Sequence, residues 1–221
     1  MGRRFGELWD LFTDAGFPLQ EGQRWQFERY LVELLKWNRT INLTALTREE
    51  DIIIKHFLGS LTFLYGFELT PQLEVLDLGS GGGFPGLPIK IVCPQISLTL
   101  IEAGQKKVAF LKHIGRTLDL KGVRYEAQRS EALVQQSLYN EFFDIVLCRA
   151  IGKLYKMVAF SFPLLKSGGS LITQKGLDFE TEVEAIAETL IVHHATLERV
   201  IPVNLPWSET SYVLLVIRKT P

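Results

Sequence analysis

The sequence has few cysteines and almost no net charge. Only Cys93 and Cys148 occur among 221 residues, which is too few for a disulfide framework and typical of a reducing compartment. The formal net charge is −1, so the whole chain carries no excess of basic groups for a polyanion, although net charge hides local basic faces. No apolar run reaches membrane-spanning length, and Glu7 and Asp10 interrupt the segment where a signal peptide needs an apolar core. We therefore expect a cytoplasmic protein with no membrane partner and no metal site.

The composition, 47% hydrophobic and 22% charged, suits one large domain with an N-terminal extension. Apolar residues at three- and four-residue spacing predict helical structure over residues 5–38. Thr47 and Glu50 fit a capping box, which predicts a second helix from about Arg48 to Tyr65. Pro71 then marks a boundary. We expect a helical extension over residues 1–70 and a ligand-binding domain over 71–221, packed as one unit.

Residues 73–86, LEVLDLGSGGGFPG, form the most informative stretch. A short apolar strand at 75–78 leads into four glycines, and an apolar segment at 87–92 suits a short helix. Strand, glycine turn and helix start are the parts of a nucleotide-binding unit, in which glycine lets a ligand approach the backbone closely. Gly79-x-Gly81-x-Gly83 resembles the first motif of S-adenosylmethionine-dependent methyltransferases, with Asp77 near the methionine end of the cofactor. Gly81-x-Gly83-x-x-Gly86 also satisfies the dinucleotide pattern, so both ligands remain open here.

The next strand supports a nucleotide in either case. Residues 96–101 read as a strand that ends at Glu102, about twenty positions past the glycines. One carboxylate accepts hydrogen bonds from both hydroxyls of a ribose. Glu102 is therefore predicted to bind the ribose of the ligand.

The remaining pattern helps to decide between the two ligands. Helices are predicted at 106–118, 154–165 and 179–191, and strands at 123–127, 143–148 and 170–174, with a turn at 167–169. Two further strands, 196–203 and 211–218, form a terminal hairpin. A hairpin appended to five alternating β/α units is typical of methyltransferases. The predicted fold is α/β: a Rossmann-like, class I S-adenosylmethionine-dependent methyltransferase, doubly wound, with a mostly parallel sheet and a terminal antiparallel strand.

Polar side chains follow three of these strands at their carboxyl ends, where ligands bind in such sheets. Ser130 and Glu131 are predicted to meet an adenine edge of the cofactor. Arg129, Arg149 and Lys175 follow the third, fourth and fifth strands. Because the cofactor is itself cationic, these three cations are not expected to serve it alone, and they suit phosphates or the guanine acceptors O6 and N7. Arg149 is predicted to bind the cofactor as well as the substrate.

The same region limits the methylation chemistry. Enzymes that methylate exocyclic amines carry an Asn/Asp-Pro-Pro-aromatic tetrad after the fourth strand, where this chain has Cys148-Arg149-Ala150-Ile151. Methylation of pyrimidine carbon 5 needs a nucleophilic cysteine, and Cys148 lies within an apolar strand, as a buried structural thiol does. Guanine N7 has an in-ring lone pair and no proton, so it requires no general base. The residues are consistent with N7 methylation without proving it.

Several segments together resemble a known family, the bacterial 16S ribosomal RNA guanine-N7 methyltransferases, also called glucose-inhibited division protein B. The matching segments are Trp37-Asn38, Ile41-Asn42-Leu43-Thr44, His56 with Ser60, the loop from Asp77 to Pro88, Glu102, Lys106 to Leu111, Arg129-Ser130-Glu131, Arg149-Ala150 and Lys175-Gly176. One departure is that Gly59 stands where the family pattern, His-x-x-Asp-Ser, has an aspartate.

The resemblance implies methyl transfer from S-adenosyl-L-methionine to N7 of one guanosine in the decoding-centre hairpin of 16S rRNA. The partner would be this rRNA within the small ribosomal subunit or an assembly intermediate, with no obligate protein partner. The resemblance also implies that Gly79, Phe84, Glu102, Ser130, Glu131 and Arg149 line the pocket, with Arg149 and Lys175 positioning the substrate. Two other hypotheses stay open: a methyltransferase acting on a small molecule or protein, and a ribosome-assembly factor with a vestigial pocket.

Overall fold

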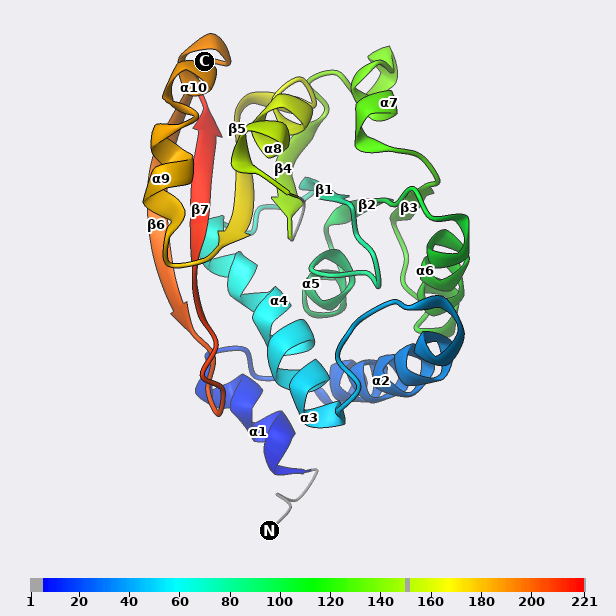
Figure 1. The fold of residues 1–221 in the computed structure, drawn as a ribbon. Helices are drawn as coiled ribbons and strands as arrows, with labels where there is room; N and C mark the ends of the chain where they lie inside the picture. Colours follow the sequence, from blue (N-terminus) through cyan, green and yellow to red (C-terminus); the bar gives the residue numbers. More distant parts are fainter. Residues whose placement is uncertain (1–5, 150–151, 221) are drawn as a thin grey trace.

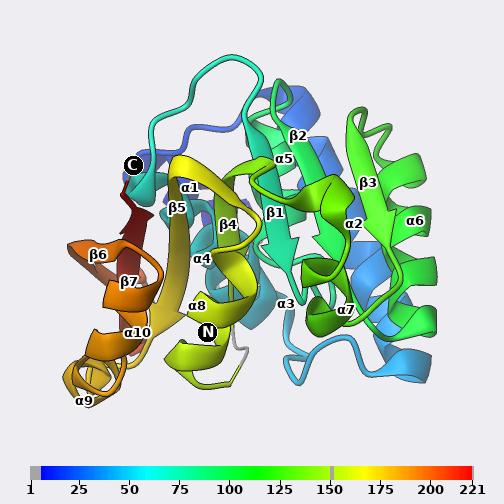
Figure 2. The same cartoon turned by 90° about the horizontal axis from the view of Figure 1, so that it is seen from above.

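A seven-stranded sheet forms the centre of the molecule, with helices against both faces (Figure 1). The computed structural model describes residues 6–149 and 152–220. The strands are β1 Glu74–Leu78, β2 Ser97–Ile101, β3 Val123–Glu126, β4 Phe143–Cys148, β5 Leu165–Lys175, β6 Ala195–Asn204 and β7 Ser211–Lys219. Their order is β3-β2-β1-β4-β5-β7-β6, which Figure 2 shows from above. β1 to β5 are parallel, and β7 runs antiparallel to both β5 and β6, so the predicted topology is confirmed.

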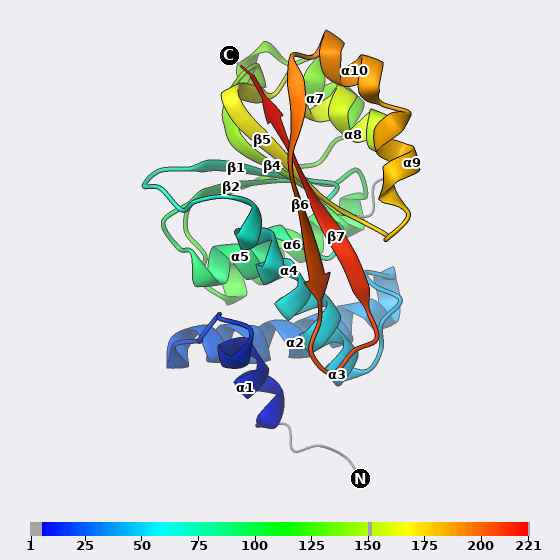
Figure 3. The same cartoon turned by 90° about the vertical axis from the view of Figure 1, so that its left-hand side faces the viewer.

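The helices divide between the two faces of the sheet (Figure 3). One face carries α5 Gly86–Val92 and α6 Gln105–Thr117, with the N-terminal helices α1 Glu7–Asp14, α2 Glu21–Ile41, α3 Glu49–Asp51 and α4 Gly59–Leu61 packed on them. The other face carries α7 Ser130–Val134, α8 Leu154–Ser161, α9 Phe179–Glu184 and α10 Ala187–Val192. Each face has its own apolar core, and the central strands contribute to both because both of their faces are covered.

The N-terminal helices share the first of these cores. Phe27 and Tyr30 of α2 lie 5.2 and 5.1 Å from the ring of Phe57 and are fully buried, as is Phe57 itself. Burying a side chain of this size contributes about 1.5–3 kcal/mol. Phe27 and Tyr30 are therefore core residues, whereas Trp25 of the same helix is 55% exposed. Tyr30 also stacks on Phe84, 5.6 Å away, and so attaches the helical segment to the sheet domain.

The N-terminal helix is shorter and more broken than the sequence predicts. Gly16 takes a left-handed conformation (φ 84°) after α1, and Pro18 cannot continue a helix, so the prediction of continuous helix over 5–38 is wrong at residues 15–20. At its other end α2 continues past the predicted limit at residue 38, to Ile41. It ends where Asn42 turns left-handed at φ 45°.

The second helical stretch has the predicted extent but an unusual geometry. It starts with α3, continues as a π-helix over Ile52–Leu58, and ends in α4 and a 3₁₀ turn, Thr62–Gly66. The predicted capping box is wrong, since the N-cap residue is Arg48 and no side chain caps the first turn. π-helical turns are rare and are often found at functional sites.

The predicted turn at 167–169 is wrong as well. These residues belong to β5, whose pairing with β4 shifts in register between Phe143 and Ile145. Gly168 takes φ 77° there, so the strand absorbs the irregularity as a bulge and continues. β5 therefore extends to Lys175, at the same edge of the sheet as the end of β4.

Candidate functional site

Four strands of the sheet end at one edge. Leu78 at the end of β1 pairs with Ile101 of β2 and with Cys148 of β4, and Cys148 pairs with Thr173 of β5. The residues that follow β1, β2 and β4 therefore start at the same level of the sheet. This register brings the glycine loop, Glu102 and Arg149 to the same rim, as expected for parallel strands.

The glycine loop is folded tightly against the end of β2. Gly79, Gly81 and Gly83 have φ values of 73°, 55° and 96°, a region that other residues adopt only with strain. The Ser80 amide donates to the Ile101 carbonyl (2.9 Å), and the Gly83 and Phe84 amides donate to the Ser80 carbonyl (2.7 and 2.9 Å). The three predicted glycines are thus required by the backbone itself.

Glu102 is bound directly to this loop. Its Oε2 accepts from the Gly81 amide (3.0 Å), and its Oε1 accepts from the Gly104 amide (2.7 Å). Each carboxylate oxygen has two acceptor sites, so one on each oxygen remains for a further donor. The carboxylate is therefore held in place with both oxygens able to accept from a diol.

Asp77 lies beneath the loop. Its side chain is fully buried, Oδ2 accepts from the Gly86 amide (2.8 Å), and Oδ1 has no hydrogen-bond partner in the part of the chain that the structure describes. Burial is the main cause that raises the pKa of Asp77 to about 7. Asp77 fixes the start of α5 relative to β1, a role that the sequence prediction of a cofactor contact did not include.

Phe84 is held between two rings from the N-terminal helices. It stacks on His56 (centroids 4.4 Å apart, 12° between planes) and on Tyr30 (5.6 Å, 10°). Tyr30 also donates from Oη to the Gly82 carbonyl at 2.5 Å. The sequence does not predict that Tyr30 and His56 both support the loop. Their distance from the loop in sequence left no local signal.

His56 has one satisfied and one unsatisfied ring nitrogen. Nε2 lies 2.6 Å from Thr44 Oγ1, and this hydroxyl oxygen accepts from the Leu46 amide, whereas Nδ1 is buried without a partner among residues 6–149 and 152–220. Burial, followed by the nearby Arg149 charge, lowers the pKa of His56 to about 3. The imidazole is therefore neutral in the folded protein at neutral pH.

This depressed pKa predicts a pH-dependent stability. Because the unfolded chain takes up a proton near pH 6.5 and the folded chain does not, the contribution of His56 is lost as pH falls from about 6.5 toward 3. The loss at about pH 5 is expected to be about 2 kcal/mol relative to neutral pH. The raised pKa of Asp77 acts in the opposite direction, because it favours folding at low pH.

Urea unfolding of wild type and of a His56→Asn variant at about pH 7.5 and 5 isolates the histidine, because Asp77 is common to both. The stability difference between the two proteins should shrink at the lower pH. A Thr44→Val variant keeps the imidazole and should keep the wild-type pH dependence. An identical pH dependence in wild type and His56→Asn would show that the imidazole is hydrated.

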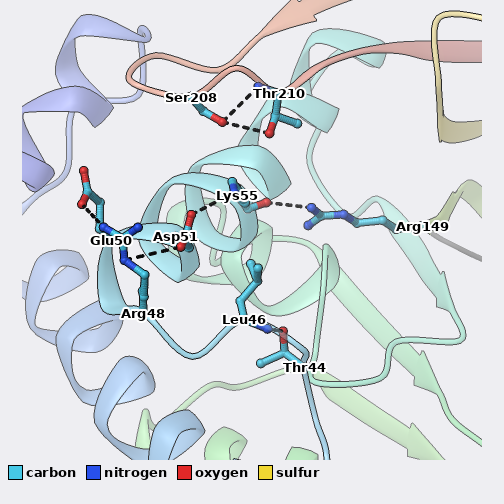
Figure 4. A network of polar contacts seen from close by, with 9 residues as sticks. All are labelled: Thr44, Leu46, Arg48, Glu50, Asp51, Lys55, Arg149, Ser208 and Thr210. Carbon is cyan, nitrogen blue, oxygen red and sulfur yellow. Dashed lines mark hydrogen bonds and ion pairs between the residues drawn. The ribbon is translucent and has the colours of Figure 1, made fainter.

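Arg149 connects the end of β4 with the π-helix. Its Nη2 donates to the Lys55 carbonyl (2.7 Å), while the ammonium of Lys55 binds Asp51 (2.8 Å), as Figure 4 shows. The other guanidinium nitrogen, Nη1, is buried and has no hydrogen-bond partner in the described part of the chain. Arg149 is thus anchored on one side and has an unsatisfied donor on the other.

The other two predicted cations lie in different surroundings. Lys175 is 8% exposed, and its ammonium binds Glu182 (2.8 Å) and the Gly152 carbonyl (3.1 Å). Arg129 is an exposed N-cap residue of α7, and it follows β3, which is three strands away from β4 in the sheet. Ser130 and Glu131 form the first turn of α7 beside it. Only Arg149 and Lys175 therefore follow neighbouring strands.

Two cavities lie outside this group of residues. One of about 600 Å³ is at the opposite end of the sheet, near Leu73, Asp144 and Ser170, and no predicted site residue lines it. Another of about 450 Å³ lies between Lys55 and the β6–β7 turn with Trp207, and Figure 4 shows Ser208 and Thr210 on that turn. The second is the one next to the Arg149 contact.

Comparison with known proteins identifies the chain's relatives. The family described as rRNA small subunit methyltransferase G matches residues 23–207. The chain belongs to this family. The ribosomal RNA small subunit methyltransferase G of Caldanaerobacter subterraneus subsp. tengcongensis is 39% identical over 207 residues, covering 94% of this chain and 86% of that protein. The protein of the same name from Roseiflexus castenholzii is 36% identical over 215 residues, covering 97% and 92%.

The fold is also confirmed by solved structures. A SAM-dependent methyltransferase from Aquifex aeolicus superposes with a TM-score of 0.57 at 17% identity, over 77% of this chain and 93% of that one. At this identity the likeness concerns the fold alone. The predicted class I methyltransferase fold and the predicted family are both confirmed.

The departure at Gly59 has a structural counterpart. A Cβ at this position would lie 3.5 Å from Leu205 Cδ1 and 3.6 Å from Tyr212 Oη, and the Gly59 carbonyl accepts from Tyr212 Oη (3.3 Å). β7 therefore packs closely against the helix here. A larger side chain would have to share the space that Tyr212 occupies.

Proposed function

We propose that this protein transfers the methyl group of S-adenosyl-L-methionine to N7 of one guanosine in the decoding-centre hairpin of 16S rRNA. The family establishes the coarser statement: the chain is an S-adenosyl-L-methionine-dependent methyltransferase of small-subunit rRNA. The observation that carries the proposal is the hydrogen bond between the Gly81 amide and Glu102, which joins the glycine loop to a ribose-binding carboxylate.

The residues at the rim fit this cofactor. A Cβ built on Gly81 would meet no atom closer than the Gly79 carbonyl at 3.9 Å, so the loop has open space where a ligand would approach. Glu102 keeps an acceptor site on each oxygen for the two ribose hydroxyls. We assign Gly79, Gly81, Gly83, Phe84 and Glu102 to the cofactor, with Asp77 as the residue that holds the loop. Ser130 and Glu131 are proposed for the adenine edge.

The chain's contribution to catalysis is mainly to position two reactants. When bound, the cofactor supplies an electrophilic methyl carbon on a sulfonium. Guanine N7 carries no proton, so no side chain has to act as a base, and the Asp77 carboxyl is buried beneath the loop. Holding two reactants in line contributes roughly 7–11 kcal/mol in favourable cases.

Arg149 is the residue proposed to orient the guanine. Its Nη1 is an unsatisfied buried donor, and a guanidinium suits the O6 acceptor of guanine while N7 stays free to react. The Lys55 carbonyl fixes the other side of the guanidinium. Arg129, which is exposed, is proposed to bind an RNA phosphate. Lys175 is proposed to help position the substrate.

Replacing Gly81 by alanine is expected to weaken cofactor binding at least tenfold. The backbone at φ 55° makes a Cβ cost about 1–2 kcal/mol in strain, and the methyl group would project into the space left for the ligand. Calorimetry with S-adenosylhomocysteine gives the affinity, and thermal unfolding should change by only a few degrees. Unchanged affinity would remove this loop position from the pocket.

The deciding experiment measures methyl incorporation from labelled S-adenosylmethionine into small ribosomal subunits from a strain that lacks this gene. Mass spectrometry then identifies the modified base, and 7-methylguanosine at one site is the expected product. Methylation of another rRNA atom would reject the proposed N7 site but keep the family activity. No incorporation into subunits, naked 16S rRNA or assembly intermediates would favour a small-molecule or protein substrate, which the near-zero net charge mildly supports.

The state of the RNA and the place of action follow from the same proposal. We infer that the substrate is 16S rRNA within the small subunit or an assembly intermediate, and that the enzyme acts in the cytoplasm, where ribosomes are made. In the parts of the chain that the structure describes, no helix has the length and apolarity to cross a bilayer.

A further inference from the structure

One carboxylate on α9 binds two separate parts of the rim. Glu182 Oε2 accepts from the Leu154 amide (2.9 Å) and from the Lys175 ammonium (2.8 Å). The ammonium also donates to the Gly152 carbonyl (3.1 Å). A helix, the end of β5 and residues 152–154 are therefore connected by three hydrogen bonds, which we call the Glu182 clamp.

The charge of Lys175 is directed into this clamp. The Lys175 side chain is 7% exposed and that of Glu182 is 40% exposed. A buried ammonium needs compensating partners, and two of the three N–H donors of Lys175 are already engaged. The hydrogen bond from Lys175 is also the main cause that lowers the pKa of Glu182. At most one donor remains for a phosphate of the RNA.

The clamp fixes residues 152–154, which lie shortly after Arg149 in the sequence. Leu154 is the first residue of α8, and its amide is one of those left without an intrahelical acceptor, so the carboxylate satisfies it. Gly152 takes a left-handed φ of 52°, and its carbonyl accepts from the Lys175 ammonium. Three positions earlier in the sequence, Arg149 donates to the Lys55 carbonyl.

We propose that Glu182 is a positioning residue for methyl transfer: through Lys175 and Leu154 it holds residues 152–154 beyond β4, and Lys175 acts through this clamp and not as a ligand of RNA phosphate. The proposal rests on the proposed function, because these residues closely follow, in the sequence, the residue assigned to the guanine. In this arrangement Lys175 helps to position the substrate without contacting it.

The test uses Glu182→Gln, Lys175→Met and their double variant, with Glu184→Gln as a matched control on an exposed residue of the same helix. Glutamine still accepts from Leu154 but loses the ion pair. We expect kcat to fall about tenfold or more in both single variants, with the KM for subunits, its salt dependence and S-adenosylhomocysteine affinity unchanged. The double variant should be no worse than either single one, since both remove one coupled unit. Glu184→Gln should match wild type.

A phosphate role for Lys175 gives the opposite results. Freeing the ammonium in Glu182→Gln would then lower the KM at low salt, and Lys175→Met would reduce the logarithmic salt slope of binding by about 1. Either result would overturn the proposal.

Hydrogen exchange separates this proposal from the proposed function. The Leu154 amide should exchange much faster in Glu182→Ala than in Glu182→Gln, whatever the methylated substrate is. Equal protection of this amide in wild type and Glu182→Ala would show that no clamp exists, even if 7-methylguanosine is the product. Loss of protection together with methylation at another atom would instead keep the clamp and reject the N7 assignment.

Discussion

Replacing Arg149 by alanine is expected to lower kcat for methyl transfer by about 100-fold or more while leaving S-adenosylhomocysteine affinity nearly unchanged. The guanidinium is anchored by the Lys55 carbonyl, and in the proposed function its Nη1, which has no partner among the described residues, binds the base. A fixed donor at a reacting group typically contributes this much, because it needs no reorganisation during the reaction. The measurement is labelled methyl incorporation at saturating subunits and cofactor.

The fold should survive this substitution. The Lys55 carbonyl loses a donor, which costs about 1–3 kcal/mol when the acceptor stays buried, or several degrees in melting temperature. Arg149→Lys keeps the charge but loses the two separate terminal nitrogens of the guanidinium, and should restore only part of the rate. Arg129→Ala serves as the comparison, because an exposed phosphate contact should raise KM and leave kcat unchanged. A collapse of stability in Arg149→Ala would show that the residue is structural.

Replacing Gly83 by alanine is expected to abolish cofactor binding and to lower stability by about 2–5 kcal/mol. The new Cβ would lie 2.4 Å from Tyr30 Oη and 2.5 Å from Leu87 Cδ1, at a backbone φ of 96°. The Tyr30–Gly82 hydrogen bond and the glycine loop cannot both keep their positions, so the loop must move away from Tyr30. Calorimetry and thermal unfolding measure the two effects.

Gly81→Ala provides the contrast, because its Cβ meets nothing in the protein and should affect the ligand more than the fold. Adding Tyr30→Phe to Gly83→Ala removes the hydroxyl at 2.4 Å and should recover part of the stability. If Gly83→Ala kept both its melting temperature and its cofactor affinity, this result would show that α2 does not pack tightly against the loop.

The sheet and the loop could be predicted because their signals are local. β1 is an apolar run followed directly by glycines, and the loop bends at Gly79, Gly81 and Gly83, where the sequence supplies residues that tolerate a positive φ. Glu102 was found because it ends the strand next to that loop. Each of these features lies within one strand and the turn that follows it.

The support of the loop could not be predicted because it depends on long-range contacts. Tyr30 meets the Gly82 carbonyl across 52 residues, and Arg149 meets the Lys55 carbonyl across 94. The aromatic spacing in α2 indicates a buried face without saying what it covers. Likewise, the position of Lys175 at the end of β5 does not indicate that its ammonium binds Glu182 on α9.

The local errors have a shared physical origin. The apolar pattern of residues 5–38 continues through Gly16 and Pro18, but backbone conformation ends α1 there. Gly168 suggested a turn, yet a bulge lets β5 continue through it. In both places the side-chain pattern indicates a continuous element or a turn, and the conformation of one glycine gives the other result. The sequence alone does not tell which of the two the folded chain adopts.

The position of β7 has a consequence for the order of folding during synthesis. β7 follows every other strand in the sequence, yet it lies inside the sheet between β5 and β6. While the ribosome is still making residues 195–210, β6 has no neighbour to pair with and the edge of β5 is open. Tyr212, which reaches Gly59 and Thr62 across some 150 residues, is missing as well. The gap in the sheet between β5 and β6 is therefore filled last, once β7 has been made.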